Sequence, residues 1–163
     1  MNTGYRIYVE KKTAFQVEAR SLKEELNENL SLHLTNLRLL NVYDLFGFTP
    51  ELLERSRYSV FGEVVTDCVT DYVALDTEHN SESLDISDVK FIAVEYLPGQ
   101  FDQRAASAVD CVHLIEPKAD IRIKSSRLYI LDNDVDDEAI AKIKQYVINP
   151  VEAREKDLRV LCD

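Results

Sequence analysis

The chain has 163 residues, 45% hydrophobic and 30% charged, which is typical of a globular domain and excludes a disordered segment. Its formal net charge of −11 argues against partners that need Lys and Arg surfaces, namely nucleic-acid backbones and anionic membranes. The three cysteines are far apart and form no Cys-x-x-Cys pair, so we expect a reducing compartment and no disulfide framework. With neither a signal-peptide pattern nor a run of ~20 apolar residues, we expect a cytoplasmic protein.

The first half predicts a strand, a helix, a strand and a second helix. Residues 5–9 alternate as a strand does, and Thr13 with Gln16 fits a capping box that begins a helix to about residue 30. The expected core stripe of that helix is Phe15, Leu22, Leu26 and Leu30.

Three further elements follow in this half. Residues 36–45 read as a half-buried strand that Gly47 ends. Thr49 and Pro50 supply an N-cap and a first helical position for a short helix to about residue 57. Residues 58–76 are rich in β-branched side chains and predict one or two strands.

The stretch 77–88 is polar, acidic and rich in serine. We interpret it as a connecting loop and as the boundary between two halves. His79 lies within it, and we interpret this single histidine as a solvated loop residue rather than a ligand or a catalytic group.

The second half repeats the order of the first. Residues 91–97 predict a buried strand, Pro98-Gly99 is the strongest turn signal of the chain, and a helix should then run to about residue 115. Its expected inner face is Phe101, Ala105, Ala108, Val112 and Ile115.

The remaining elements complete this half. Residues 121–131 alternate as a strand. Acidic residues from 134 to 138 favour the beginning of a last helix, which Asn149-Pro150 ends, with Ile140, Ile143 and Val147 inside. Residues 151–163 are charged and read as a short terminal helix or the start of a linker.

The matching order of elements predicts the fold class. We expect an α+β fold with a pseudo-twofold, duplicated strand-helix-strand-helix unit, in which antiparallel sheets carry helices on one face. The domain should span residues 1–150, with repeats at about 1–76 and 88–150.

Most active-site signatures are missing from the sequence. Its four glycines cannot form a phosphate loop, and its three scattered histidines form no zinc pattern. Cys111 and His113 are two residues apart on a helix and cannot face each other, so we expect Cys111 to be a small, semi-buried residue. Asp134, Asp136 and Asp137 resemble a cation site, but helix capping explains them better.

One polar cluster, Gln100 to Arg104, lies where a strand ends and a helix begins. Arg104 and the helix N-terminus could contact an anion or polar substrate, with Asp102 and Gln103 orienting it. Alternatively, Asp102 caps the helix and Arg104 pairs with a nearby acid, which composition and spacing alone favour.

The string YLPGQFDQRAASA at residues 96–108 resembles a motif of phosphoribosylformylglycinamidine synthase, the large single-chain, glutamine-dependent enzyme of purine biosynthesis. Further similarity runs through RIYVEKK (6–12), NVYDLFGF (41–48), VVTDCV (64–69) and NPVEAREKDL (149–158), in the order expected for the N-terminal region of that family. The resemblance covers essentially the whole chain, but not the ATP-binding synthetase domains or the glutaminase domain.

The resemblance implies an N-terminal domain that resembles a dimer of the family's small accessory subunit. It would dock the synthetase and glutaminase domains, which would be its partners, and help to enclose the ammonia path between them. The complete ligase would use ATP, magnesium and glutamine, whereas this segment would be inactive, with no catalytic residue, cofactor or metal ligand of its own. Facing the synthetase site or another domain would be Gln100, Asp102, Gln103, Arg104 and Ser107.

Two other classes of protein fit the same pattern. One is a stand-alone regulatory module of ferredoxin-like or ACT-like type that binds a small metabolite in the pseudo-twofold cleft. The other is a free-standing acidic interaction protein.

Overall fold

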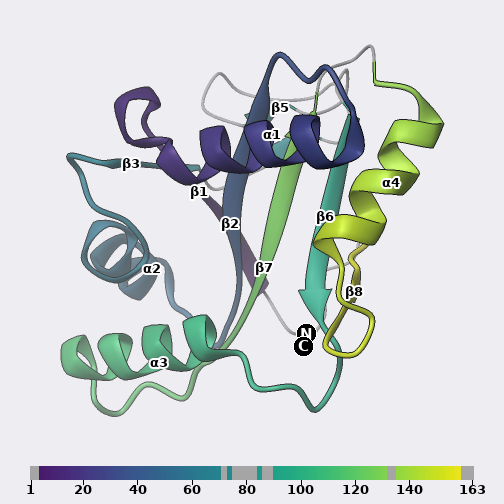
Figure 1. Ribbon diagram of the computed structural model, residues 1–163. Helices are drawn as coiled ribbons and strands as arrows, with labels where there is room; N and C mark the ends of the chain where they lie inside the picture. Colours follow the sequence, from purple (N-terminus) through teal and green to yellow (C-terminus); the bar gives the residue numbers. More distant parts are fainter. Residues whose placement is uncertain (1–3, 71–72, 75–83, 86–89, 132–134, 159–163) are drawn as a thin grey trace.

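A computed structural model describes residues 4–70, 73–74, 84–85, 90–131 and 135–158 of the chain. The fold is α+β, with helices packed on a six-stranded antiparallel sheet (Figure 1). The two halves of the sequence lie side by side in this sheet, and they meet where strand β2 (Leu37–Phe46) pairs with β7 (Arg122–Leu131). The full strand order is β3 (Asp67–Thr70), β1 (Gly4–Lys11), β2, β7, β6 (Lys90–Tyr96) and β8 (Ala153–Glu155). The predicted fold class is confirmed, and the two predicted sheets are one continuous sheet.

Each half contributes a strand-helix-strand-helix-strand unit. The first half comprises β1 (Gly4–Lys11), a 3-10 turn (Thr13–Phe15), α1 (Val17–Leu30), β2 (Leu37–Phe46), α2 (Pro50–Ser56), a π-helical segment η2 (Arg57–Phe61) and β3 (Asp67–Thr70). The second comprises β6 (Lys90–Tyr96), α3 (Gln103–Ile115), β7 (Arg122–Leu131), α4 (Asp137–Val147) and β8 (Ala153–Glu155). Between the halves, β4 (Val73–Ala74) pairs in parallel with β5 (Leu84–Asp85). β4 lies in the stretch 58–76 that predicted strands, whereas β5 lies inside the stretch 77–88 that was predicted to be a loop.

The helices pack on one face of the sheet, and they interleave the two halves. Leu26 of α1 and Ile143 of α4 are fully buried in one apolar cluster. Leu52 of α2 and Val112 of α3 belong to another cluster on the same face. Because each cluster combines a helix from the first half with a helix from the second, the two repeats share their core.

The opposite face of the sheet is apolar as well. It carries Tyr8, Leu40, Val42, Ala93, Leu128 and Ile130, and all of them are buried. Leu158, which lies beyond the last strand, packs into this cluster. Residues 151–163 were predicted to form a short terminal helix or the start of a linker. Their described part, 151–158, instead contributes the edge strand β8 and this contact.

Two predicted helix starts are wrong in detail. The predicted capping box at Thr13 and Gln16 does not form: α1 begins at Val17, Gln16 makes no capping hydrogen bond, and its amide donates to Lys11 O instead. Phe15 and Phe101 were predicted core residues, but their side chains are 42% and 74% exposed. Both precede the first helical turn, so the helical spacing that placed them inside does not apply there.

The β-branched stretch after α2 is less extended than predicted. The helix continues through η2, which buries Phe61 against the ring of Tyr43 at a centroid distance of 4.9 Å. Val64 and Val65 follow in an exposed turn before β3 begins. A tertiary contact of one aromatic side chain therefore overrides the local β propensity.

Gly47 ends β2 with φ +81, a left-handed conformation that glycine adopts without strain. A Cβ atom at this position would come 2.3 Å from the carbonyl oxygen of Asp120, in the connection between α3 and β7. This close approach joins the ends of the two central strands. None of the described helices combines the length and apolar character needed to cross a membrane.

Candidate functional site

The turn between β6 and α3 fixes the position of the predicted polar cluster, residues 100–104. Leu97 O accepts a hydrogen bond from Gln100 N at 3.0 Å, and Gly99 has φ +88. Proline followed by a glycine with positive φ is the signature of a type II turn. The chain thus reverses at Pro98-Gly99, and α3 begins four residues after Gly99, at Gln103.

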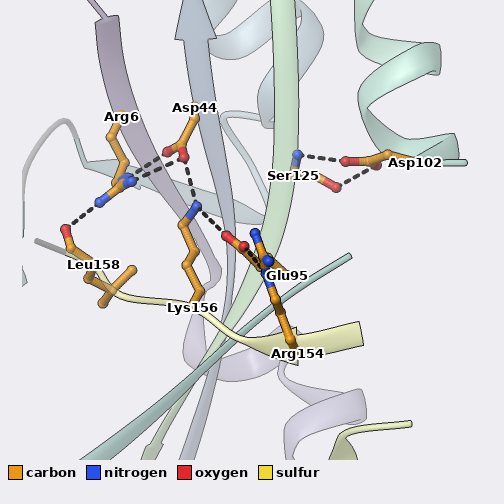
Figure 2. A network of polar contacts seen from close by, with 8 residues as sticks. All are labelled: Arg6, Asp44, Glu95, Asp102, Ser125, Arg154, Lys156 and Leu158. Atoms are coloured by element: carbon orange, nitrogen blue, oxygen red, sulfur yellow. Dashed lines mark hydrogen bonds and ion pairs between the residues drawn. The ribbon is translucent and has the colours of Figure 1, made fainter. Parts of the chain in front are cut away.

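Asp102 fixes the start of α3 to the centre of the sheet. Its Oδ1 accepts from Ala105 N at 2.9 Å, as an N-cap does, and from the Ser125 hydroxyl at 2.7 Å. Its Oδ2 accepts from Ser125 N, also at 2.7 Å, and Ser125 is buried in β7 (Figure 2). Both carboxylate oxygens are therefore used inside the protein, and Asp102 is a positioning residue for the side chains that follow it.

The other predicted site residues surround this anchor and are exposed: Gln100, Gln103, Arg104 and Ser107. The expected ion pair between Arg104 and a neighbouring acid does not form among the residues that the structure describes. The prediction that Asp102 caps the helix is therefore confirmed. The predicted ion pair of Arg104 is not seen in the described part of the chain.

Arg104 reaches a hollow on the helical face, which we call the central groove. The groove has a volume of about 230 Å³ and is lined mainly by β1, β2 and the start of α1, with Arg104 of α3 and Arg127 of β7 completing it. Its polar lining is Lys11, Gln16, Glu18, Asn41, Asp67, Arg104 and Arg127. The sequence did not predict this groove, although Asn41 and Arg127 are polar residues in the middle of β2 and β7.

Two ion pairs cross the lining of the central groove. Arg127 Nη2 donates to Glu18 Oε1 at 2.7 Å, which joins β7 to α1. Lys11 Nζ lies 2.9 Å from Asp67 Oδ1, so the ends of β1 and β3 are joined in the same way. These pairs neutralise four of the five charged residues of the lining, and the charge of Arg104 is left over.

A second polar constellation lies on the opposite face of the sheet (Figure 2). Asp44, only 2% exposed, accepts from Arg6 Nε at 2.5 Å and from Lys156 Nζ at 2.9 Å. Lys156 also lies 3.3 Å from Glu95, whose other oxygen accepts from Arg154 at 2.8 Å. Arg6 donates further to Leu158 O at 2.5 Å, so the network holds the C-terminal segment against the sheet.

Burial and charge shift two pKa values in this network. Burial alone would lower the pKa of Arg6, but the hydrogen bond and charge of Asp44 outweigh it and raise the pKa. Burial raises the pKa of Tyr8 to about 12, against the opposing charge of Arg6. Arg6 therefore stays charged and Tyr8 stays neutral at physiological pH, which is what a structural network requires.

The other aspartate, cysteine and histidine residues considered in the sequence have structural roles or lie outside the described residues. Asp136 caps α4 by accepting from Ala139 N at 2.8 Å, as predicted, whereas Asp134 lies outside the described residues. Cys111 was predicted to be semi-buried and is exposed, because it lies on the outer side of α3. His79 and Cys162 also lie outside the described residues. Within the described ranges, no group of His, Cys, Asp and Glu is arranged to hold a metal.

Comparison with protein-family models and with curated proteins finds no match for this chain. The geometry described above and the resemblance noted in the sequence are therefore the basis for a functional proposal.

Proposed function

We propose that this chain is the N-terminal docking domain of a phosphoribosylformylglycinamidine synthase and acts in the cytoplasm. The complete enzyme would convert formylglycinamide ribonucleotide, glutamine and ATP to formylglycinamidine ribonucleotide, glutamate, ADP and phosphate. The domain would contribute no reacting group. It would hold the synthetase and glutaminase domains together and help to enclose the path of ammonia.

The observation that carries this proposal is the exposed polar cluster on a rigid support. Asp102 ties the start of α3 to Ser125, and the side chains of Gln100, Gln103, Arg104 and Ser107 project from that fixed turn. These side chains make no hydrogen bond or ion pair with the described residues, and polar groups held in place in this way suit a surface that meets another domain. The exposed Phe101 beside them, 74% accessible, adds an apolar contact at the same place.

The duplicated fold is also consistent with the proposal. The sheet order reads the same from either end when the two halves are exchanged, as in a dimer of one small subunit fused into a single chain. Such a platform is rigid, because its helices share their core across the repeat. Ammonia must travel between two active sites without loss to water, so a rigid partner that seals the path would promote coupling.

The test uses the complete enzyme with Arg104→Ala, and Lys118→Ala as a matched control at an exposed lysine after α3. We expect Arg104→Ala to lower turnover with glutamine while sparing turnover with added ammonium, because coupling and not the synthetase chemistry is impaired. The melting temperature should change little, since the Arg104 side chain makes no described ion pair. Unchanged kinetics together with a lowered melting temperature would contradict the proposal.

A further inference from the structure

The central groove contains three buried polar atoms that make no hydrogen bond within the described part of the chain. Asp67 Oδ1 still has the Lys11 ammonium at 2.9 Å, whereas Asn41 Oδ1, an acceptor, and Arg127 Nε, a donor, have no partner there. Asn41 and Arg127 are directly opposite each other in the β2–β7 register, so their Cβ atoms are about 4.5–5.5 Å apart. Folding leaves few such atoms unpaired in a protein interior, and here a complementary pair lies in one groove.

Charge adds to this pattern. Arg104 projects into the groove beyond the Lys11–Asp67 and Arg127–Glu18 ion pairs, so the lining has an excess of one positive charge. The protein as a whole has a net charge of −11. A locally cationic groove in an acidic protein favours an anionic group on its ligand.

The two unpaired atoms define what the anionic ligand must also carry. Guanidinium groups such as those of Arg104 and Arg127 bind carboxylates through charge-assisted hydrogen bonds. Asn41 Oδ1 needs a donor close to that carboxylate, and an ammonium group supplies three N–H donors. A carboxylate and an ammonium joined through one carbon atom meet both requirements.

The size and the floor of the groove fit the same class of molecule. A volume of about 230 Å³ is below the roughly 300–1,000 Å³ of pockets for drug-sized ligands, so a nucleotide is too large. Val9, Leu39 and Phe61 provide an apolar surface on which a side chain could rest. We propose that the central groove binds a free α-amino acid. This site shares Arg104 with the docking surface, but binding at it needs no other domain.

The experiment is an NMR titration of the full chain with the common α-amino acids, one at a time. We expect at least one of them to shift the amide signals of Asn41, Arg104 and Arg127 saturably, and to raise the melting temperature with concentration. Acetate and methylammonium, which each carry only one of the two groups, should give no saturable shift at the same concentration.

Variants test the residues themselves. Arg104→Gln should weaken amino-acid binding by about tenfold, the value of one charge-assisted hydrogen bond. Asn41→Leu, which removes the unpaired acceptor, should abolish the preference for the amino acid over acetate. Lys118→Gln, an exposed cation outside the lining, should leave binding unchanged.

Three results would overturn the inference. They are no saturable shift with any amino acid, equal affinity for acetate or inorganic phosphate, and equal weakening by Arg104→Gln and Lys118→Gln. Because the titration uses the chain by itself, its failure says nothing about docking. The ratio of glutamine-driven to ammonium-driven turnover tests docking separately.

Discussion

Replacing Asp44 with alanine tests whether the buried network stabilises the fold. Asp44 is the shared counter-ion of Arg6 and Lys156, whose side chains are 9% and 7% exposed. Removing one partner of a buried ion pair costs about 3–5 kcal/mol, because the opposite charge is left uncompensated. Lys156 keeps Glu95 and Arg6 keeps Leu158 O, so we expect a loss close to about 3 kcal/mol.

The size of this loss can be measured by urea unfolding and thermal melting. Against a total of about 5–15 kcal/mol it is a large share of the stability, and it corresponds to a melting temperature lower by roughly 6–12 °C. Asp44→Asn should cost nearly as much as Asp44→Ala, since it keeps the volume and removes only the charge.

The matched control is Glu155→Ala. Glu155 pairs with Lys144 at 3.0 Å, but both side chains are exposed, at 54% and 36%, and such surface pairs contribute about 0–1 kcal/mol. If Asp44→Ala and Glu155→Ala cost the same, the argument that burial makes the Asp44 network important is refuted.

Two further predictions concern single side chains. Asp102→Ala should lower the free energy of unfolding by about 2–3 kcal/mol, because three hydrogen bonds are lost. The control Asp136→Ala loses one capping hydrogen bond and should cost about 1 kcal/mol. Equal losses of the two variants in urea unfolding would contradict the anchoring role of Asp102. The pKa of Tyr8 is raised from 10.0 to about 12, so its contribution is present below pH 10 and is lost as pH rises toward 12. Over that range the wild-type protein should lose about 2–3 kcal/mol more than Tyr8→Phe, and parallel stability curves for the two proteins would contradict this.

Local patterns in the sequence predicted most of the elements. The strands predicted at residues 5–9, 36–45, 91–97 and 121–131 correspond to β1, β2, β6 and β7. Helix caps at Thr49, Asp102 and Asp136 were also predicted, because capping depends on residues within one turn.

The candidate site was predictable only in part. The Pro98-Gly99 turn and the exposed residues after it follow from local chemistry. The bond from Asp102 to Ser125 joins residues 23 positions apart, and no local pattern reports it. The central groove likewise depends on the β2–β7 register, which brings Asn41 opposite Arg127.

The sequence by itself determined the α+β class, the order of the elements and the place where α3 begins, because hydrophobic periodicity, turn residues and caps act over a few residues. Only the tertiary structure decided that the two halves form one sheet with a shared core. It also decided that Arg104 reaches a groove beside two unpaired polar atoms, that Arg154 lies in the edge strand β8, and that the Lys156 side chain is buried. These outcomes depend on strand pairing and side-chain burial between segments that are distant in the sequence. Local patterns of residues do not report the free energy of such long-range contacts.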